Sequence, residues 1–187
     1  MNQSRQETDR FPEQEGALSA AGLEYRRQLA ARKGSVPAPY GLLLHSPAVA
    51  QAFESLSSAL WQGALPRRVM EGLFLLNAQR HLCRDQWVRH VGKARDAGLA
   101  QEVIDCLGAG REPAPAQDPA FHAAWQLAAT LQGPGPVDDA LFAQLQQHYS
   151  AAAIAELSTF CGFASIVSNA LRVRQPGMPA DSEGAPF

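Results

Sequence analysis

Apolar residues recur along this chain at intervals of three and four, which is the spacing of an amphipathic helix. No stretch shows the alternation of apolar and polar residues that is typical of a β-strand. The pattern predicts helices over 19–33, 47–61, 66–81, 83–97, 100–107, 119–131, 137–149 and 151–173. The predicted fold class is therefore all-α, a multi-helix bundle.

Residues that start and stop helices set these boundaries. Gly34 follows the first helix, whose last turn carries basic side chains. Ser46-Pro47 and Asp118-Pro119 each place a capping side chain before a proline at the first helical position, whereas Pro66 begins its helix without such a cap. The segment 36–41, VPAPYG, is predicted to be an extended connector.

Length and composition indicate one globular domain. The chain has 187 residues, of which 46% are hydrophobic and 18% charged, enough to bury a sizeable core. We assign 16–175 to a single helical domain and expect flexible tails over 1–15 and 176–187. The first fifteen residues are polar and acidic, unlike a secretory signal peptide.

One apolar stretch, 151–171, has the length of a membrane span. Glu156 and several hydroxyl and amide side chains interrupt it, and no basic cluster precedes it. Its many small residues permit close approach of other helices. We interpret the stretch as a helix packed in the core or at a subunit interface, and we expect no membrane partner.

Charge, cysteine content and motifs exclude several other classes. A net charge of −2 does not favour nucleic acid as a partner. The three cysteines are widely spaced and form neither a disulfide framework nor a zinc motif, which favours a reducing, cytoplasmic setting. The histidines lack ligand spacing and no glycine-rich phosphate loop occurs, so we expect neither metal nor cofactor.

The segment 71–90, EGLFLLNAQRHLCRDQWVRH, carries the candidate chemistry. Cys83, Gln86 and His90 are spaced i, i+3 and i+7, which places them on one helical face. Glu71 lies twelve residues before Cys83, on the apolar stretch that leads into that helix. Carboxylate, thiol, amide and imidazole groups gathered in one hollow would form a candidate reaction site with no metal.

Each of these residues has a functional and a structural interpretation. His90 is a candidate acid–base group near neutral pH, or else a solvated or carbonyl-bonded histidine. Glu71 is a candidate for orienting His90, or else a helix-start carboxylate that pairs with Arg67 or Arg68. Cys83 is a candidate reactive thiol or an inert buried one.

Candidate substrate-binding groups surround these residues. Gln86 is a candidate hydrogen-bonding partner for a substrate, or else a surface residue, and Trp87 is a candidate pocket wall. Basic residues exceed acidic ones between Arg67 and Arg95, which favours an anionic small-molecule substrate. Among them Arg84 is the candidate for binding it, because no partner stands four residues away.

These residues resemble the carboxymuconolactone decarboxylase-like family, which shares a superfamily with the alkylhydroperoxidase AhpD. The resemblance covers 40–173 and rests on Glu71, the run 83–90, LLHSP at 43–47 and AELSTFCGFASIVSNALRV at 155–173. It implies an all-helical subunit that assembles into a homo-oligomer, a trimer or hexamer. In the peroxidase branch a Glu precedes Cys-x-x-Cys-x-x-x-His, and Gln86 stands here where that pattern has its second cysteine.

Three functions follow. The first is a metal-free acid–base enzyme of the decarboxylase-like type, acting on a small anionic lactone or carboxylic acid through His90 and Glu71. The second is a thiol-dependent hydroperoxide reductase acting through Cys83, although Gln86 cannot supply the resolving thiol. The third is a non-catalytic helical assembly module. The first is the function predicted from the sequence, and the sequence does not identify the substrate.

Overall fold

The computed structural model describes residues 10–11, 13, 16–175 and 184–187, and it contains no β-strand among them. The predicted tails therefore lie mostly outside the described residues. The helices are α1 (Ala20–Lys33), α2 (Tyr40–Leu43), α3 (Pro47–Trp61), α4 (Arg67–Arg80), α5 (Arg84–Asp96), α6 (Gln101–Gly108), α7 (Pro119–Leu131), α8 (Asp139–His148) and α9 (Ala151–Arg174). The prediction of an all-α fold is confirmed.

Side-chain caps fix several of the helix starts. Ser19, Asp118, Asp138 and Ser150 each accept a hydrogen bond from the backbone N–H three residues ahead, as a capping residue does. The predicted cap at Ser46 is wrong, because its side chain makes no such bond and the proline that follows begins α3 alone.

The predicted extended connector is also partly wrong, because it ends in the short helix α2. Pro39 has φ −62° and ψ −28°, which is helical geometry, and Tyr40 N–H donates to the Pro37 carbonyl at 2.9 Å. The fixed φ of proline favours this turn. As a result Tyr40 points its ring into the core, where it is buried.

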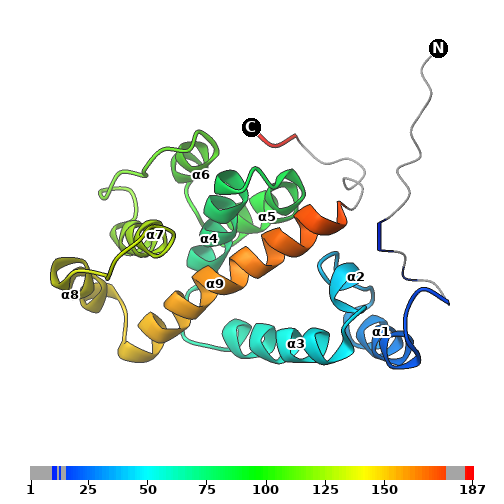
Figure 1. The fold of residues 1–187 in the computed structure, drawn as a ribbon. Helices are drawn as coiled ribbons and strands as arrows, with labels where there is room; N and C mark the ends of the chain where they lie inside the picture. The colour runs from blue at the N-terminus through cyan, green and yellow to red at the C-terminus, as the bar shows by residue number, and fades with distance from the viewer. Residues whose placement is uncertain (1–9, 12, 14–15, 176–183) are drawn as a thin grey trace, which may run out of the picture.

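Helix α4 lies at the centre of the molecule. Ten of its 14 residues are buried, and it packs against α5, α6, α7 and α9 (Figure 1). Gly72 provides the close approach to α7, because the ring of Phe121 occupies the space that a β-carbon would need. A helix covered on all sides gives its polar side chains a fixed environment, which matters for Glu71.

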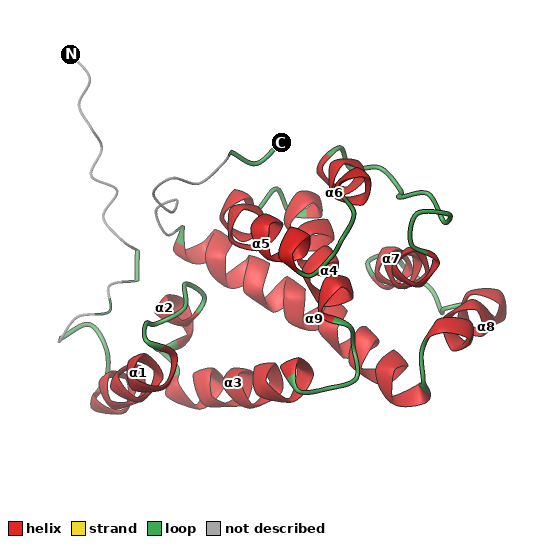
Figure 2. Cartoon of the chain, turned by 180° about the vertical axis from the view of Figure 1, so that it is seen from behind, coloured by secondary structure: helices red, strands yellow, loops and turns green. Residues whose placement is uncertain are grey.

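Helix α9 crosses the molecule and joins its two ends (Figures 1 and 2). It contacts α2, α3, α4, α5, α7 and α8. By length and apolar composition alone this helix is also long enough to cross a membrane, a test that core helices pass as well. Its contacts with six other helices agree with the interpretation of 151–171 as a helix packed against protein.

Candidate functional site

The connection between α4 and α5 brings the two ends of the candidate segment together. Leu82 adopts a left-handed conformation with φ 49°, and Cys83 N–H donates to the Ala78 carbonyl at 2.8 Å. The chain thereby reverses direction, and α5 runs back along α4. Glu71 on α4 and His90 on α5 consequently face each other.

Glu71 and His90 form a hydrogen-bonded pair. The distance from His90 Nδ1 to Glu71 Oε2 is 2.7 Å. Glu71 is fully buried, whereas the His90 side chain keeps 13% of its surface exposed. Arg67 also approaches the carboxylate, with 3.4 Å between its Nη2 and Glu71 Oε1. The predicted meeting of acid and imidazole is therefore confirmed as geometry.

The hydrogen bond assigns the tautomer of His90. A carboxylate only accepts, so Nδ1 carries the proton and donates it to Glu71, which leaves the lone pair of Nε2 available. Burial lowers the pKa of His90, while the bond and charge of Glu71 act in the opposite direction. Lys93 and Arg89 lower the pKa further. The imidazole is thus neutral near pH 7 and able to accept a proton.

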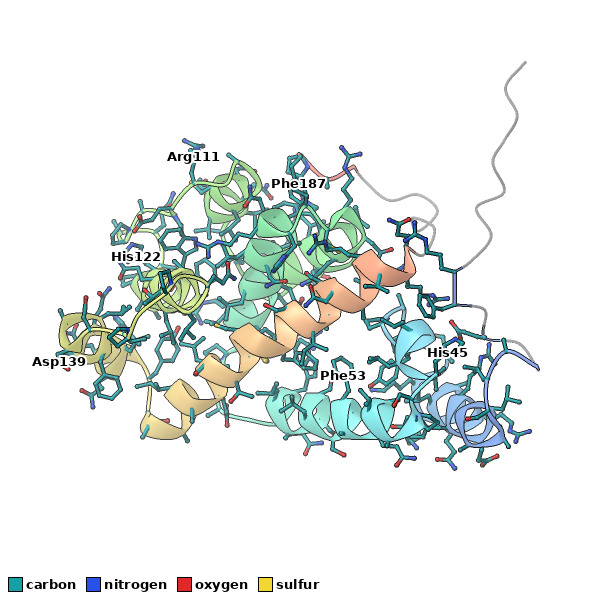
Figure 3. All side chains as sticks on the ribbon, in the orientation of Figure 1. His45, Phe53, Arg111, His122, Asp139 and Phe187 are labelled. Carbon is teal, nitrogen blue, oxygen red and sulfur yellow. The ribbon has the colours of Figure 1, made fainter. Side chains whose placement is uncertain are left out.

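A cavity of about 610 Å³ opens beside this pair. Its walls come from the segment 33–40, α3, α4, α5 and α9. The apolar part is aromatic, with Phe53 stacked on Phe163 at 4.9 Å between ring centroids and Phe74 stacked on His90 at 4.0 Å. Figure 3 shows Phe53 on the side of α3 that faces α9. A small ring-bearing molecule fits a cavity of this size.

Basic side chains also line the cavity. They are Lys33, Arg67, Arg89 and Lys93. Glu71 is the only carboxylate among the residues described as lining it. The local excess of positive charge favours an anionic ligand, as the sequence predicts.

The N-terminal segment closes one side of the cavity. Glu54 on α3 accepts a hydrogen bond from the Tyr40 hydroxyl and pairs with Lys33 Nζ at 2.9 Å. Arg174, at the end of α9, donates to the Ala38 carbonyl at 2.8 Å. Sequence reasoning missed Tyr40 and Phe53 as lining residues, because only the tertiary packing of distant segments brings them to His90.

Cys83 does not share this cavity, so the expectation that it lies there beside His90 is wrong. It occupies the N-cap position of α5, two helical turns from His90, and is buried. Two turns correspond to roughly 11 Å along the axis. Burial raises the pKa of the Cys83 thiol, the opposite of what activates a thiolate.

Gln86 is buried and does not line this cavity, so its interpretation as a surface residue is wrong. Its side chain is fully buried and donates from Nε2 to the Phe74 carbonyl at 3.2 Å. Its Oε1 accepts from Ser168, whose Oγ also lies 2.5 Å from Asn77 Oδ1. Gln86 thus belongs to a buried polar network that joins α4, α5 and α9.

Trp87 and Arg84 also lie outside the cavity beside His90. Trp87 lines a second cavity of about 370 Å³, and its ring meets that of Phe187 at 5.4 Å. Arg84 Nε donates to the Phe187 backbone oxygen at 2.8 Å. The structure thus gives Trp87 the predicted place in a cavity wall, although not in the cavity beside His90, and substrate binding by Trp87 and Arg84 stays a prediction. The basic groups beside His90 are those on α4, α5 and the end of α1.

Solved structures share this fold. The core of an alkylhydroperoxidase AhpD, an uncharacterized peroxidase-related protein from Ralstonia eutropha JMP134, superposes with a TM-score of 0.71 at 18% identity over 92% of this chain and 93% of that one. The chain has the AhpD-like fold. An uncharacterized peroxidase-related protein from Silicibacter sp. TM1040 also gives 0.71, at 16% identity over the whole of both chains. No protein-family model and no curated protein matches the sequence.

Within this AhpD-like fold the cysteines form no disulfide and no metal-binding group forms among the described residues. Cys83, Cys106 and Cys161 are all free. No three side chains of His, Cys, Asp or Glu come together in the described part of the chain. The His90–Glu71 pair lies beside a basic, aromatic cavity.

Proposed function

We propose that this AhpD-like protein is an acid–base enzyme of the carboxymuconolactone decarboxylase-like type, which acts without a metal on a small anionic lactone or carboxylic acid. The observation that carries the proposal is the 2.7 Å pair of His90 Nδ1 and buried Glu71 beside a cavity with basic walls. A neutral imidazole held by a carboxylate is a typical general base.

His90 moves the proton in this mechanism. Its Nε2 takes up a proton from the solvent, and the imidazolium that forms is stabilised by the charge of Glu71. The bond between the substrate and its carboxylate breaks, carbon dioxide leaves, and the electron pair moves into a conjugated carbonyl. The proton on His90 then passes to carbon, which restores the neutral imidazole. One basic side chain of the cavity binds the substrate carboxylate before it leaves.

A second candidate function is a thiol-dependent hydroperoxide reductase acting through Cys83. It is favoured by the peroxidase-related description of both structural neighbours. In this reaction a Cys83 thiolate attacks the O–O bond, forms a sulfenic acid and releases an alcohol, and an external thiol reduces the sulfur. The buried thiol and its raised pKa oppose it, which makes it the second choice.

Two substitutions separate these functions. We expect His90→Ala to abolish carbon dioxide release from carboxylated lactones, while Cys83→Ser leaves it within about twofold, because Cys83 is outside the cavity. Peroxide consumption in the presence of dithiothreitol is measured in parallel. Loss of peroxide turnover in Cys83→Ser, with no lactone turnover in the unmodified protein, would replace the first function by the second.

The setting of the reaction is part of the same proposal. We place the protein in the cytoplasm, where free thiols persist, and expect it to form a trimer or hexamer of identical subunits. Its partner is a small molecule, with no role for nucleic acid, membrane or cofactor.

A further inference from the structure

The four basic side chains of the cavity differ in their partners. Lys33 pairs with Glu54 at 2.9 Å, and Arg67 approaches Glu71 at 3.4 Å. Arg89 binds Asp85 through two hydrogen bonds, of 2.6 and 3.1 Å. Each of these cations is therefore already balanced by a carboxylate.

Lys93 is different. No carboxylate lies within ion-pair distance of its ammonium group among the described residues, and the side chain is exposed at the edge of the cavity. It follows His90 by three residues on α5, so both side chains project from the same face of that helix. Side chains at this spacing have β-carbons about 5–6 Å apart. A carboxylate bound by Lys93 would therefore lie within one helical turn of the imidazole.

The same cavity also has an aromatic lining, which suits a flat, apolar group. Phe53 and Phe163 are stacked at 4.9 Å between centroids, and Trp61 stacks on Phe74 at 6.3 Å. Aromatic walls prefer planar or ring-bearing ligands, whose faces and edges they contact. A ligand for this cavity thus combines a ring with one negative charge.

We propose that Lys93 is the specificity-determining residue of the cavity and binds the carboxylate of a ring-bearing monocarboxylate, whose ring lies against the aromatic wall. The proposal rests on the proposed function for the chemical step and adds the substrate class and the residue that selects it. Lys93 and His90 lie on one turn of α5. A carboxylate bound by Lys93 therefore brings the substrate atom next to it toward the imidazole of His90.

The test is a binding measurement that requires no turnover. Benzoate is titrated into the protein while the ring-proton NMR signal of His90, identified by its absence in His90→Asn, is followed. Acetate carries the same charge without the ring and serves as the ligand control. Lys33→Gln is the matched protein control, since it removes a cavity charge that Glu54 already balances.

We expect benzoate to shift the His90 signal saturably and to bind at least about tenfold more tightly than acetate. Lys93→Gln should weaken benzoate about tenfold, Lys93→Arg should restore most of the affinity, and Lys33→Gln should change it less than about threefold. Equal weakening in Lys93→Gln and Lys33→Gln, or equal affinity for benzoate and acetate, would overturn the proposal. If benzoate binds as expected but His90→Ala still releases carbon dioxide from carboxylated lactones, the proposed function is overturned instead.

Discussion

The replacement Glu71→Gln tests the electrostatic role of the buried carboxylate. Glutamine keeps the size of the side chain, so the packing of α4 is preserved while the negative charge is lost. Its amide nitrogen can donate to His90 Nδ1, which would move the imidazole proton to Nε2. The atom that faces the substrate would then carry a proton and would no longer accept one.

The magnitude follows from the 2.7 Å contact between His90 Nδ1 and Glu71 Oε2. A hydrogen bond to a charged group contributes about 1.5–3 kcal/mol. Loss of that stabilisation from the imidazolium-like transition state corresponds to a decrease in kcat of roughly 10- to 200-fold. If the tautomer is also reversed, the decrease approaches about 10⁴-fold. The Cys83→Ser variant, which leaves the pair intact, is the control.

Two measurements check this prediction. Nitrogen-15 NMR of the histidine rings distinguishes a protonated Nδ1 from a protonated Nε2, and a pH titration gives the pKa of His90. Because the bond and charge of Glu71 raise that pKa against the effect of burial, Glu71→Gln should lower it. An unchanged tautomer together with an unchanged pKa would show that the carboxylate does not control the imidazole, and the reasoning would fail.

Three other outcomes are expected. Burial lowers the pKa of His90, so the imidazole stays neutral over a wider range of pH. The acid limb of the kcat/KM profile should therefore lie below pH 6.5, the ordinary pKa of histidine. An acid limb at or above pH 6.5 would contradict this prediction. Thiol titration at pH 7 should modify Cys106 first, because burial raises the pKa of Cys161 to about 12 and also that of Cys83, so Cys106→Ser should remove the fast phase. Ser168→Ala should lower the free energy of unfolding by about 1–3 kcal/mol, because it removes the hydroxyl between the Gln86 and Asn77 amides. Ser158→Ala, at an exposed position, is the control. Equal stability of the two variants in urea unfolding would show that the network adds no stability.

Local sequence signals predicted most of the helices and one contact of the site. Periodicity and the Asp118 cap located helix starts that depend only on neighbouring residues. The Glu71–His90 contact was predictable because both residues belong to consecutive helices joined by a short turn. The helical turn at Tyr40 was missed, since Pro37 and Pro39, which precede it, resemble the prolines of an extended segment.

The other site residues on α5 could not be placed from the sequence, because their surroundings depend on how that helix packs against the rest of the molecule. Cys83, Gln86 and His90 share a helical face by spacing, yet they meet three different environments along the axis. The thiol lies at the helix start, the amide meets the buried network, and only the imidazole reaches the cavity. The remaining walls come from the N-terminal segment, α3 and α9, whose contacts with His90 are too distant along the chain for a local pattern to show.

The turn at Leu82 fixes how α5 is rotated about its axis relative to α4. A residue added to or removed from the turn at 81–83 would change both the rotation of α5 about its axis and its position along α4. An insertion there would carry His90 away from Glu71 while leaving both helices intact. Homologous chains that use the same acid and imidazole should therefore tolerate length changes in most of their other loops but keep this turn at constant length.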